Sequence, residues 1–236
     1  MDSQAGGSIG DRVSFVLDRI RSAEEASGRP KGSVRLVAAT KAVSSERIRE
    51  GIAAGLTLAG ENRLQEALPK IEALQGEPIK WHFIGQLQRR KVRSVIGIFE
   101  LIHSVDSFDL AQEIDRRAEA AGRQQDILLE VNIGGEGSKS GFESGDLEQT
   151  LLRFGTLTHV AVKGLMAVPP PVDVAEQARR YFRALRELAR RLSLQAIPRI
   201  SMDELSMGMS NDYQVAIEEG ATLVRVGTAI FGARHV

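Results

Sequence analysis

The stretch VRLVAAT at residues 34–40 is a short apolar run that ends in a polar residue, and seven further runs of this kind follow it. A nearly continuous apolar run of this length is typical of a strand that is buried on both faces of a parallel sheet. The later runs are LTLAG (56–60), IKWHFIG (79–85), FELIHS (99–104), DILLEVN (126–132), VAVKGLM (160–166), PRISM (198–202) and TLVRVG (222–227).

Amphipathic helical patterns separate these runs. They cover residues 45–54, 63–74, 108–121, 147–154, 174–192 and 212–219, and another at 9–26 precedes the first strand, with Ser8 or Asp11 available as its cap. Alternating strands and helices predict an α/β fold with a parallel sheet. Eight units without a GxGxxG fingerprint favour a closed (β/α)8 TIM barrel with an extra N-terminal helix over an open sheet. We expect residues 1–236 to form a single domain, with a flexible tail at 1–8.

Composition excludes several classes of function. Lys plus Arg equals Asp plus Glu at 31 each, so no overall field attracts nucleic acid or an anionic membrane. The basic run QRRKVR (88–93) is interpreted as a solvated helix face rather than as a nucleic-acid site. The chain has no cysteine and no apolar run of about 20 residues, and its start, MDSQAGGSIGDRV, lacks the basic segment followed by an apolar stretch that is typical of a secretory leader. A cytoplasmic protein without disulfides or a membrane span is therefore expected.

Binding groups of such a barrel lie at the carboxyl ends of its strands, so the residues that end the apolar runs should converge. They are Lys41, Glu61, Asn62, His82, His103, Ser104, Asn132, Met166, Ser201 and Arg225. Amides, imidazoles and two cations around one cavity suit a polar, anionic ligand. No carboxylate or cysteine stands at ligand spacing from the two histidines, so no metal site is predicted and these imidazoles are expected to be hydrogen-bonded at the mouth.

Lys41 directly follows the first run. Burial of its stem would favour the neutral amine, a nucleophile that forms an imine with an aldehyde, although a surface lysine that opens a loop is the plainer alternative. After the seventh run comes LSMGMSND (205–212), whose Ser210 and Asn211 can cap the helix at 212–219. After the eighth comes RVGTAIFG (225–232), where Gly227 permits close backbone approach and the Thr228 hydroxyl can donate. Loops in these positions commonly bind phosphate in barrels. Together, these groups suit a phosphorylated aldehyde.

An ordered set of motifs resembles a known family over about residues 9–232. These motifs are VAATK (37–41), GEN (60–62), WHFIGQLQRRK (81–91), HSVDS (103–107), VNIGGEGSKSGF (131–142), GLMAV (164–168), LSMGMSND (205–212) and VRVGTAIFG (224–232). The family that they resemble is that of the pyridoxal phosphate homeostasis proteins, the YggS/PROSC family.

The resemblance implies a barrel like the N-terminal domain of bacterial alanine racemase that carries pyridoxal 5′-phosphate without catalytic turnover. Lys41 would be its Schiff-base lysine. The phosphate would be held by Ser210, Gly227 and Thr228, with the backbone of Met209. Such a protein would contribute to intracellular vitamin B6 and amino-acid homeostasis, with pyridoxal phosphate-dependent apoenzymes as recipients. We expect a monomer.

The resemblance also implies the remaining walls of the site. Asn62 would lie near the cofactor ring, Arg225 would face the pyridine nitrogen, and His82 and Met207 would line the pocket. A cation beside that nitrogen disfavours its protonation, and an unprotonated ring is a poorer electron sink. This argues against transamination and decarboxylation. The sequence leaves open a structural alternative, in which Arg225 pairs with a carboxylate such as Glu130.

A pyridoxal phosphate-dependent amino-acid racemase is the rival hypothesis. Racemisation needs a second base on the opposite face of the substrate carbon. In racemases of this barrel type, a tyrosine from a second domain supplies it, and we expect no such domain here because the chain ends at Val236. Tyr181 lies within a helical pattern, Tyr213 follows the capping sequence, and Lys139 lies in a loop that could reach the mouth. None is an evident second base, so a non-enzymatic carrier is the preferred interpretation.

Overall fold

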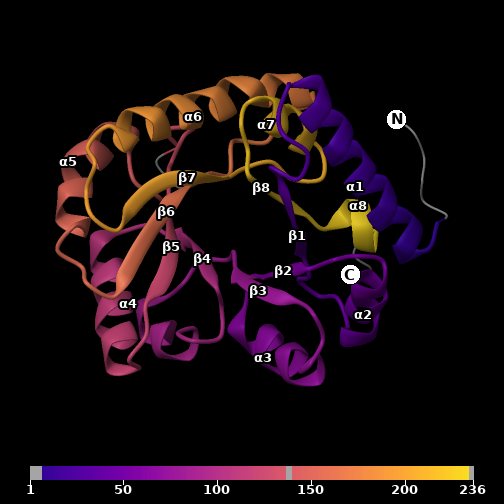
Figure 1. Ribbon diagram of the computed structural model, residues 1–236, viewed down its shortest axis with the longest axis horizontal. Helices are drawn as coiled ribbons and strands as arrows, with labels where there is room; N and C mark the ends of the chain where they lie inside the picture. Colours follow the sequence, from indigo (N-terminus) through magenta and orange to yellow (C-terminus); the bar gives the residue numbers. More distant parts are fainter. Residues whose placement is uncertain (1–6, 137–139, 234–236) are drawn as a thin grey trace.

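The computed structural model describes residues 7–136 and 140–233, and within them eight parallel strands close into a barrel in chain order (Figure 1). The strands are β1 (Arg35–Ala39), β2 (Leu58–Glu61), β3 (Lys80–Phe83), β4 (Leu101–Val105), β5 (Gln125–Glu130), β6 (Val160–Met166), β7 (Ile200–Ser206) and β8 (Leu223–Val226). Strands β8 and β1 pair directly, which closes the barrel. The predicted TIM barrel is confirmed.

Helices surround the strands, and the longest of them, α1 and α6, lie along the outside of the barrel (Figure 1). The helices are α1 (Ile9–Ala26), α2 (Ser45–Ala53), α3 (Leu64–Ala73), α4 (Phe108–Ala120), α5 (Ser144–Phe154), α6 (Arg179–Ser193), α7 (Tyr213–Glu218) and α8 (Thr228–Phe231), with 3₁₀ turns η1 (Arg89–Ser94) and η2 (Ala175–Ala178). The basic run at 88–93 largely coincides with η1. None of these helices is long and apolar enough to cross a membrane, for residues 7–136 and 140–233.

The predicted leading helix forms and is capped as expected. The Ser8 side chain accepts a hydrogen bond from the backbone N–H of Asp11, whose carboxylate accepts the backbone N–H of Ser8 in return. This reciprocal capping box satisfies two of the N–H groups that every helix start leaves free. Helix α1 then packs against α7 and α8 through one apolar face. It therefore covers the outside of the region in which the last two strands end.

Burial on both faces explains why the strands are apolar throughout. In β1, Val37 points into the barrel and packs in a cluster that also contains Leu58, Leu128 and Leu223. The neighbouring Ala38 belongs to the larger cluster between strands and helices. Alternate residues of a strand point to opposite faces, so neither face of β1 is left for polar side chains. Polar groups are confined to the two ends of the barrel and to a few buried positions.

Strand β7 differs from the prediction. The apolar run ended at residue 202, whereas the strand continues through polar residues to Ser206. Side-chain contacts satisfy this extension: Glu204 accepts hydrogen bonds from Arg35 and from the Thr222 hydroxyl. Gly164 on β6 makes room for it, because a Cβ there would lie 1.9 Å from the Glu204 carbonyl oxygen. The placement of Ser201 at the mouth was therefore wrong, since Ser201 lines a pocket at the opposite end of the barrel.

Candidate functional site

Lys41 follows β1 after one intervening residue, Thr40, at the carboxyl end of the barrel. The chain turns here, with the backbone N–H of Val43 donating to the Thr40 carbonyl oxygen at 3.0 Å. Ala42 has a φ of 57°, in the left-handed region that alanine rarely adopts. Lys41 itself is half-buried. The turn thus breaks the strand direction at the residue whose amine was predicted to react.

A buried ion pair fixes the strand end below Lys41. The Lys70 ammonium of α3 donates to the Thr40 carbonyl oxygen at 2.7 Å and to Glu61 Oε1 at 2.8 Å. The Thr40 hydroxyl donates to the same Glu61 oxygen at 2.6 Å. Glu61 therefore points outward to α3, and the expectation that it lines the mouth was wrong. Its neighbour Gly60 occupies the inward position, as the alternation of a strand requires.

The loops after β7 and β8 meet beside the end of β1. The Ser210 hydroxyl accepts a hydrogen bond from the backbone N–H of Ala229 at 3.4 Å, which joins the two loops. Gly227 lies against β1, and a Cβ there would be 3.0 Å from the Ala39 carbonyl oxygen. Thr228 follows at the start of α8. The structure thus brings Ser210, Gly227 and Thr228 together near the strand that leads to Lys41.

The predicted cap of the helix after β7 is wrong. Helix α7 begins at Tyr213, and neither Ser210 nor Asn211 caps it. Asp212 organises the turn instead, because its carboxylate accepts the backbone N–H of Met209 at 2.6 Å. Burial raises the pKa of Asp212, against the opposing effect of this hydrogen bond. The Ser210 hydroxyl therefore does not cap α7 and instead accepts the hydrogen bond from Ala229 that joins the two loops.

Arg225 forms part of the barrel interior at the level of Val37 on the neighbouring β1. Its guanidinium donates to the carbonyl oxygens of Ser206 at 2.7 Å and Ala167 at 2.9 Å, and also to the Ser206 hydroxyl. Burial lowers the pKa of Arg225 to about 10, while the charges of Glu130 and Asp212 oppose this shift. Arg225 is therefore a buried cation held by neutral acceptors at the ends of β6 and β7. Among the described residues, its hydrogen bonds do not include Glu130, the alternative partner considered from the sequence.

Two histidines continue this polar core. The Ser206 hydroxyl lies 2.8 Å from His103 Nδ1, and His103 Nε2 lies 3.0 Å from His82 Nδ1. Burial lowers the pKa of His82 to about 4, and it lowers that of His103 well below its usual value. Both rings are therefore neutral at pH 7. His82 also borders the pocket at the amino ends of the strands, so it lies deeper in the barrel than the predicted mouth position.

Ser206 was missed by the sequence reasoning, which ended this strand too early. Its one signal in the sequence is its place directly before the loop MGMSND. Asn62, in contrast, lies where it was expected: half-buried directly after β2, with its backbone pressed against Gly85. Met207 is fully buried in the cluster between strands and helices, so its side chain packs with the shell of the barrel. Met209 is 39% exposed on the loop before α7.

Asn132, another residue from the sequence interpretation, has a different role. Asn132 hydrogen-bonds to the Glu136 backbone and to the Glu143 carboxylate, and so it holds the loop after β5 in place. Lys139 lies outside the described residues. Within residues 7–136 and 140–233, no three His, Cys, Asp or Glu side chains are grouped as a metal site would need.

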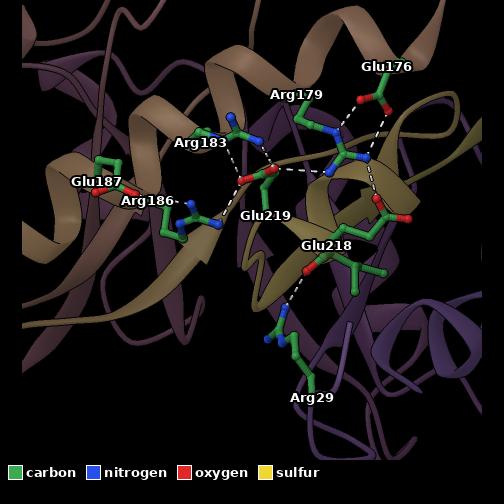
Figure 2. A network of polar contacts seen from close by, with 9 residues as sticks. Arg29, Glu176, Arg179, Arg183, Arg186, Glu187, Glu218 and Glu219 are labelled. Atoms are coloured by element: carbon green, nitrogen blue, oxygen red, sulfur yellow. Dashed lines mark hydrogen bonds and ion pairs between the residues drawn. The ribbon is translucent and has the colours of Figure 1, made fainter. Parts of the chain in front are cut away.

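A cluster of charges anchors the far end of α7 to α6, as Figure 2 shows. The Glu219 carboxylate accepts hydrogen bonds from Arg179 and Arg183 at 3.1 Å and from Arg186 at 2.8 Å. Its side chain is 5% exposed, so the three arginines shield it from water. Glu218 extends the cluster by pairing with Arg179. The helix whose first turn follows the Ser210 loop is thus held at its opposite end by ion pairs.

The assembled groups suit one kind of ligand. A half-buried primary amine lies at one side of the mouth, and the hydroxyl-bearing loops of Ser210 and Thr228 lie beside the same strand. The close contact between Gly227 and Ala39 keeps side chains out of that junction. A buried guanidinium completes the floor. An anion that also carries an amine-reactive carbonyl group matches these donors.

The chain matches the family described as "Alanine racemase, N-terminal domain" over residues 17–235. The pyridoxal phosphate homeostasis protein of Aquifex aeolicus is 48% identical over 224 residues, which cover 95% of this chain and 97% of the relative. The protein of that name from Pseudomonas aeruginosa is 42% identical, with 96% of both chains covered. The solved structure of PipY from Synechococcus elongatus with PLP bound superposes with a TM-score of 0.82 at 36% identity, over 95% of this chain and all of PipY.

Proposed function

This chain belongs to the family of pyridoxal phosphate homeostasis proteins, and we propose that it holds pyridoxal 5′-phosphate as a Schiff base on Lys41 without catalytic turnover. The observation that carries the proposal is the arrangement of the mouth. An amine at the end of β1 and the loops of Ser210 and Thr228 lie beside one strand. Together they match the aldehyde and the phosphate of this cofactor. PipY, which shares the fold, has been solved with PLP bound.

The phosphate is assigned to Ser210, Gly227 and Thr228, together with the backbone of Met209. Ser210 and Thr228 offer hydroxyl groups, and Gly227 allows the backbone to approach closely. The hydrogen bond from Ala229 to Ser210 supports this assignment because it joins the two loops into one unit. Two loops held together provide a preorganised anion site, which reduces the entropy lost on binding.

The ring is assigned to the space between Asn62 and Arg225, with His82 deeper in the barrel; the Met207 side chain packs in the shell between strands and helices, so we assign it no contact with the ring. The guanidinium of Arg225 makes three hydrogen bonds to the described residues. A guanidinium has five N–H groups, so two of them are not used by residues 7–136 and 140–233 and can donate to a ring nitrogen that accepts. When bound, the cofactor supplies an aldehyde and an electron-withdrawing ring; a cation at the ring nitrogen weakens the second property. Arg225, at the bottom of the site, thus favours storage of the cofactor over carbanion chemistry.

A carrier function follows from the reactivity of the free cofactor. Free pyridoxal phosphate is an aldehyde that modifies other amines, and attachment to Lys41 withholds it while exchange with a second amine releases it. We propose pyridoxal phosphate-dependent apoenzymes as recipients, the cytoplasm as the site of action, and the monomer as the active form. The names of the relatives, which describe homeostasis rather than a reaction, support this proposal.

The racemase alternative lacks support from its best candidate base. Tyr213 packs within the main hydrophobic cluster and is buried. Burial raises its pKa, and the charge of Arg19 on α1, which packs against α7, opposes the shift. The packing of this ring among apolar side chains gives no support to a role as a base. Tyr181 lies on α6 with Arg180 stacked over its ring.

The decisive experiment mixes the purified chain with pyridoxal 5′-phosphate, records the absorbance spectrum, reduces with borohydride and maps the modified residue by mass spectrometry. We expect a visible imine band, and modification at Lys41. Lys41→Ala should lose both, whereas Lys31→Ala, at an exposed lysine before β1, should keep them. Modification at Lys139 would overturn the site. Racemisation of alanine or serine that depends on Lys41 would overturn the carrier function.

A further inference from the structure

A continuous chain of hydrogen bonds runs through the barrel from the floor of the mouth. It links Arg225 to Ser206, Ser206 to His103 at 2.8 Å, and His103 to His82 at 3.0 Å. All four side chains are buried: His82, His103 and Ser206 are at most 2% exposed, and Arg225 is 6% exposed. The far end, His82, borders a polar pocket of about 390 Å³ at the amino ends of the strands. The chain thus connects the two ends of the barrel.

One arrangement gives every proton in this chain an acceptor. Arg225 can only donate, so the Ser206 oxygen accepts from it; the hydroxyl, which can still accept or donate, then donates its own proton to His103 Nδ1. In this arrangement the single N–H of the neutral His103 ring is on Nε2, where it donates to His82 Nδ1. His82 consequently carries its proton on Nε2. Each bond points away from the mouth, and aligned hydrogen bonds of this kind polarise and strengthen one another.

We propose that Ser206, His103 and His82 are positioning residues that form a one-way hydrogen-bond relay, which holds Arg225 as a donor and withholds protons from the mouth. In this relay Ser206 donates its proton to His103, and His103 donates its proton to His82. A proton could reach the mouth along this path only if the hydroxyl rotated and both imidazoles changed tautomer. Resting on the proposed function, the inference explains why a ring nitrogen beside Arg225 would stay unprotonated.

The test needs no cofactor. With histidine labelled by ¹⁵N, long-range ¹H–¹⁵N correlation spectra at pH 7 distinguish the two neutral tautomers of each ring. We expect His82 and His103 both to carry the proton on Nε2. Ser206→Ala removes the group that donates to His103 Nδ1, and the pure Nε2–H pattern of His103 should be lost. Ser104→Ala is the matched control, because its buried hydroxyl donates to the Gly85 carbonyl outside the relay.

A rescue variant separates direction from packing. In His82→Asn the amide oxygen can take the place of Nδ1 as acceptor, so His103 should keep its Nε2–H pattern. His82→Leu has no acceptor there and should change it. The relay is overturned if wild-type His103 carries its proton on Nδ1, or if Ser206→Ala leaves its pattern unaltered. These spectra are recorded without cofactor, so a failure of the relay is distinct from a missing imine band, which would refute the carrier function instead.

Discussion

Lys70 of α3 places its Nζ 2.8 Å from Oε1 of Glu61 on β2, and this ion pair is almost completely removed from water. The same ammonium hydrogen-bonds to the carbonyl oxygen of Thr40, the residue before Lys41. Two charges from separate elements are therefore used to fix the strand end that presents the reactive amine. A buried pair of this kind is costly to break because the remaining charge is left without a partner.

Lys70→Met should lower the free energy of unfolding by about 3–5 kcal/mol, measured by urea denaturation, because it leaves the Glu61 carboxylate buried and unpaired. Lys80→Met removes the exposed pair with Glu100 and should cost less than about 1 kcal/mol. The double variant Lys70→Met with Glu61→Leu should recover part of the loss, since it removes both charges. Equal losses in the two single lysine variants would contradict the interpretation.

The buried histidines predict a loss of stability in mild acid. Burial lowers the pKa of His82 to about 4, helped by the charge of Arg35, whereas a histidine in the unfolded chain titrates near pH 6.5. Between these values the unfolded chain binds a proton that the folded chain excludes. The free energy of unfolding should therefore fall by about 3 kcal/mol for His82 as the pH drops from 6.5 to 4. His82→Asn should flatten this part of the profile, and an unchanged slope would refute the assignment.

Most of the fold could be predicted because strands that are buried on both faces consist of apolar residues. Strand β1 is apolar on both faces, since Val37 packs inside the barrel and Ala38 packs under the helices. The second half of strand β7 was not predicted because it contains polar residues. Among them, Glu204 is stabilised by Arg35 and Thr222, which are distant in the sequence. A pattern of hydrophobicity contains no record of such partners. Because the predicted strand ended too early, Ser201 was assigned to the wrong end of the barrel and Ser206 was not recognised as a strand-end residue.

The candidate site could be predicted less completely, for a related reason. The positions of Lys41, Gly227 and Thr228 follow from strand ends, so a barrel brings them near one another. The direction of a side chain requires the register: Glu61 and Gly60 are adjacent, yet only Gly60 faces inward. The hydrogen bonds among Arg225, Ser206 and His103 join β8, β7 and β4, and no local pattern reports them. Likewise, Asp212 rather than Ser210 organises the turn before α7 through a contact with Met209.

Gly227→Ala tests the proposed phosphate junction. The new Cβ would lie 3.0 Å from the Ala39 carbonyl oxygen, so β8 must move away from β1 just where the loops of Ser210 and Thr228 converge. Crowding of this kind costs about 1–3 kcal/mol. Affinity for pyridoxal 5′-phosphate, measured by absorbance titration, should fall by roughly tenfold, or about 1.4 kcal/mol. Gly145→Ala, where the added Cβ meets no atom within 4 Å, is the control and should bind normally.

Glu219→Gln tests whether ion pairs at the far end of α7 stabilise the barrel. Burial raises the pKa of Glu219, but hydrogen bonds from Arg183 and Arg179 and the charge of Arg186 outweigh it, so the net shift is downward. The carboxylate therefore stabilises the fold above about pH 4.3, its usual value, and this contribution disappears as the pH falls through the lower folded value. At pH 7 the variant leaves three arginines facing a neutral amide, and its melting temperature should be clearly lower. Glu187→Gln, in a half-exposed pair with Arg186, should have a small effect. The gap between wild type and Glu219→Gln should start to narrow as the pH falls below about 4.3 and should close below the lowered folded value; a gap that keeps its full size throughout an acid titration would show that packing, rather than the charge on Glu219, holds α7 to α6.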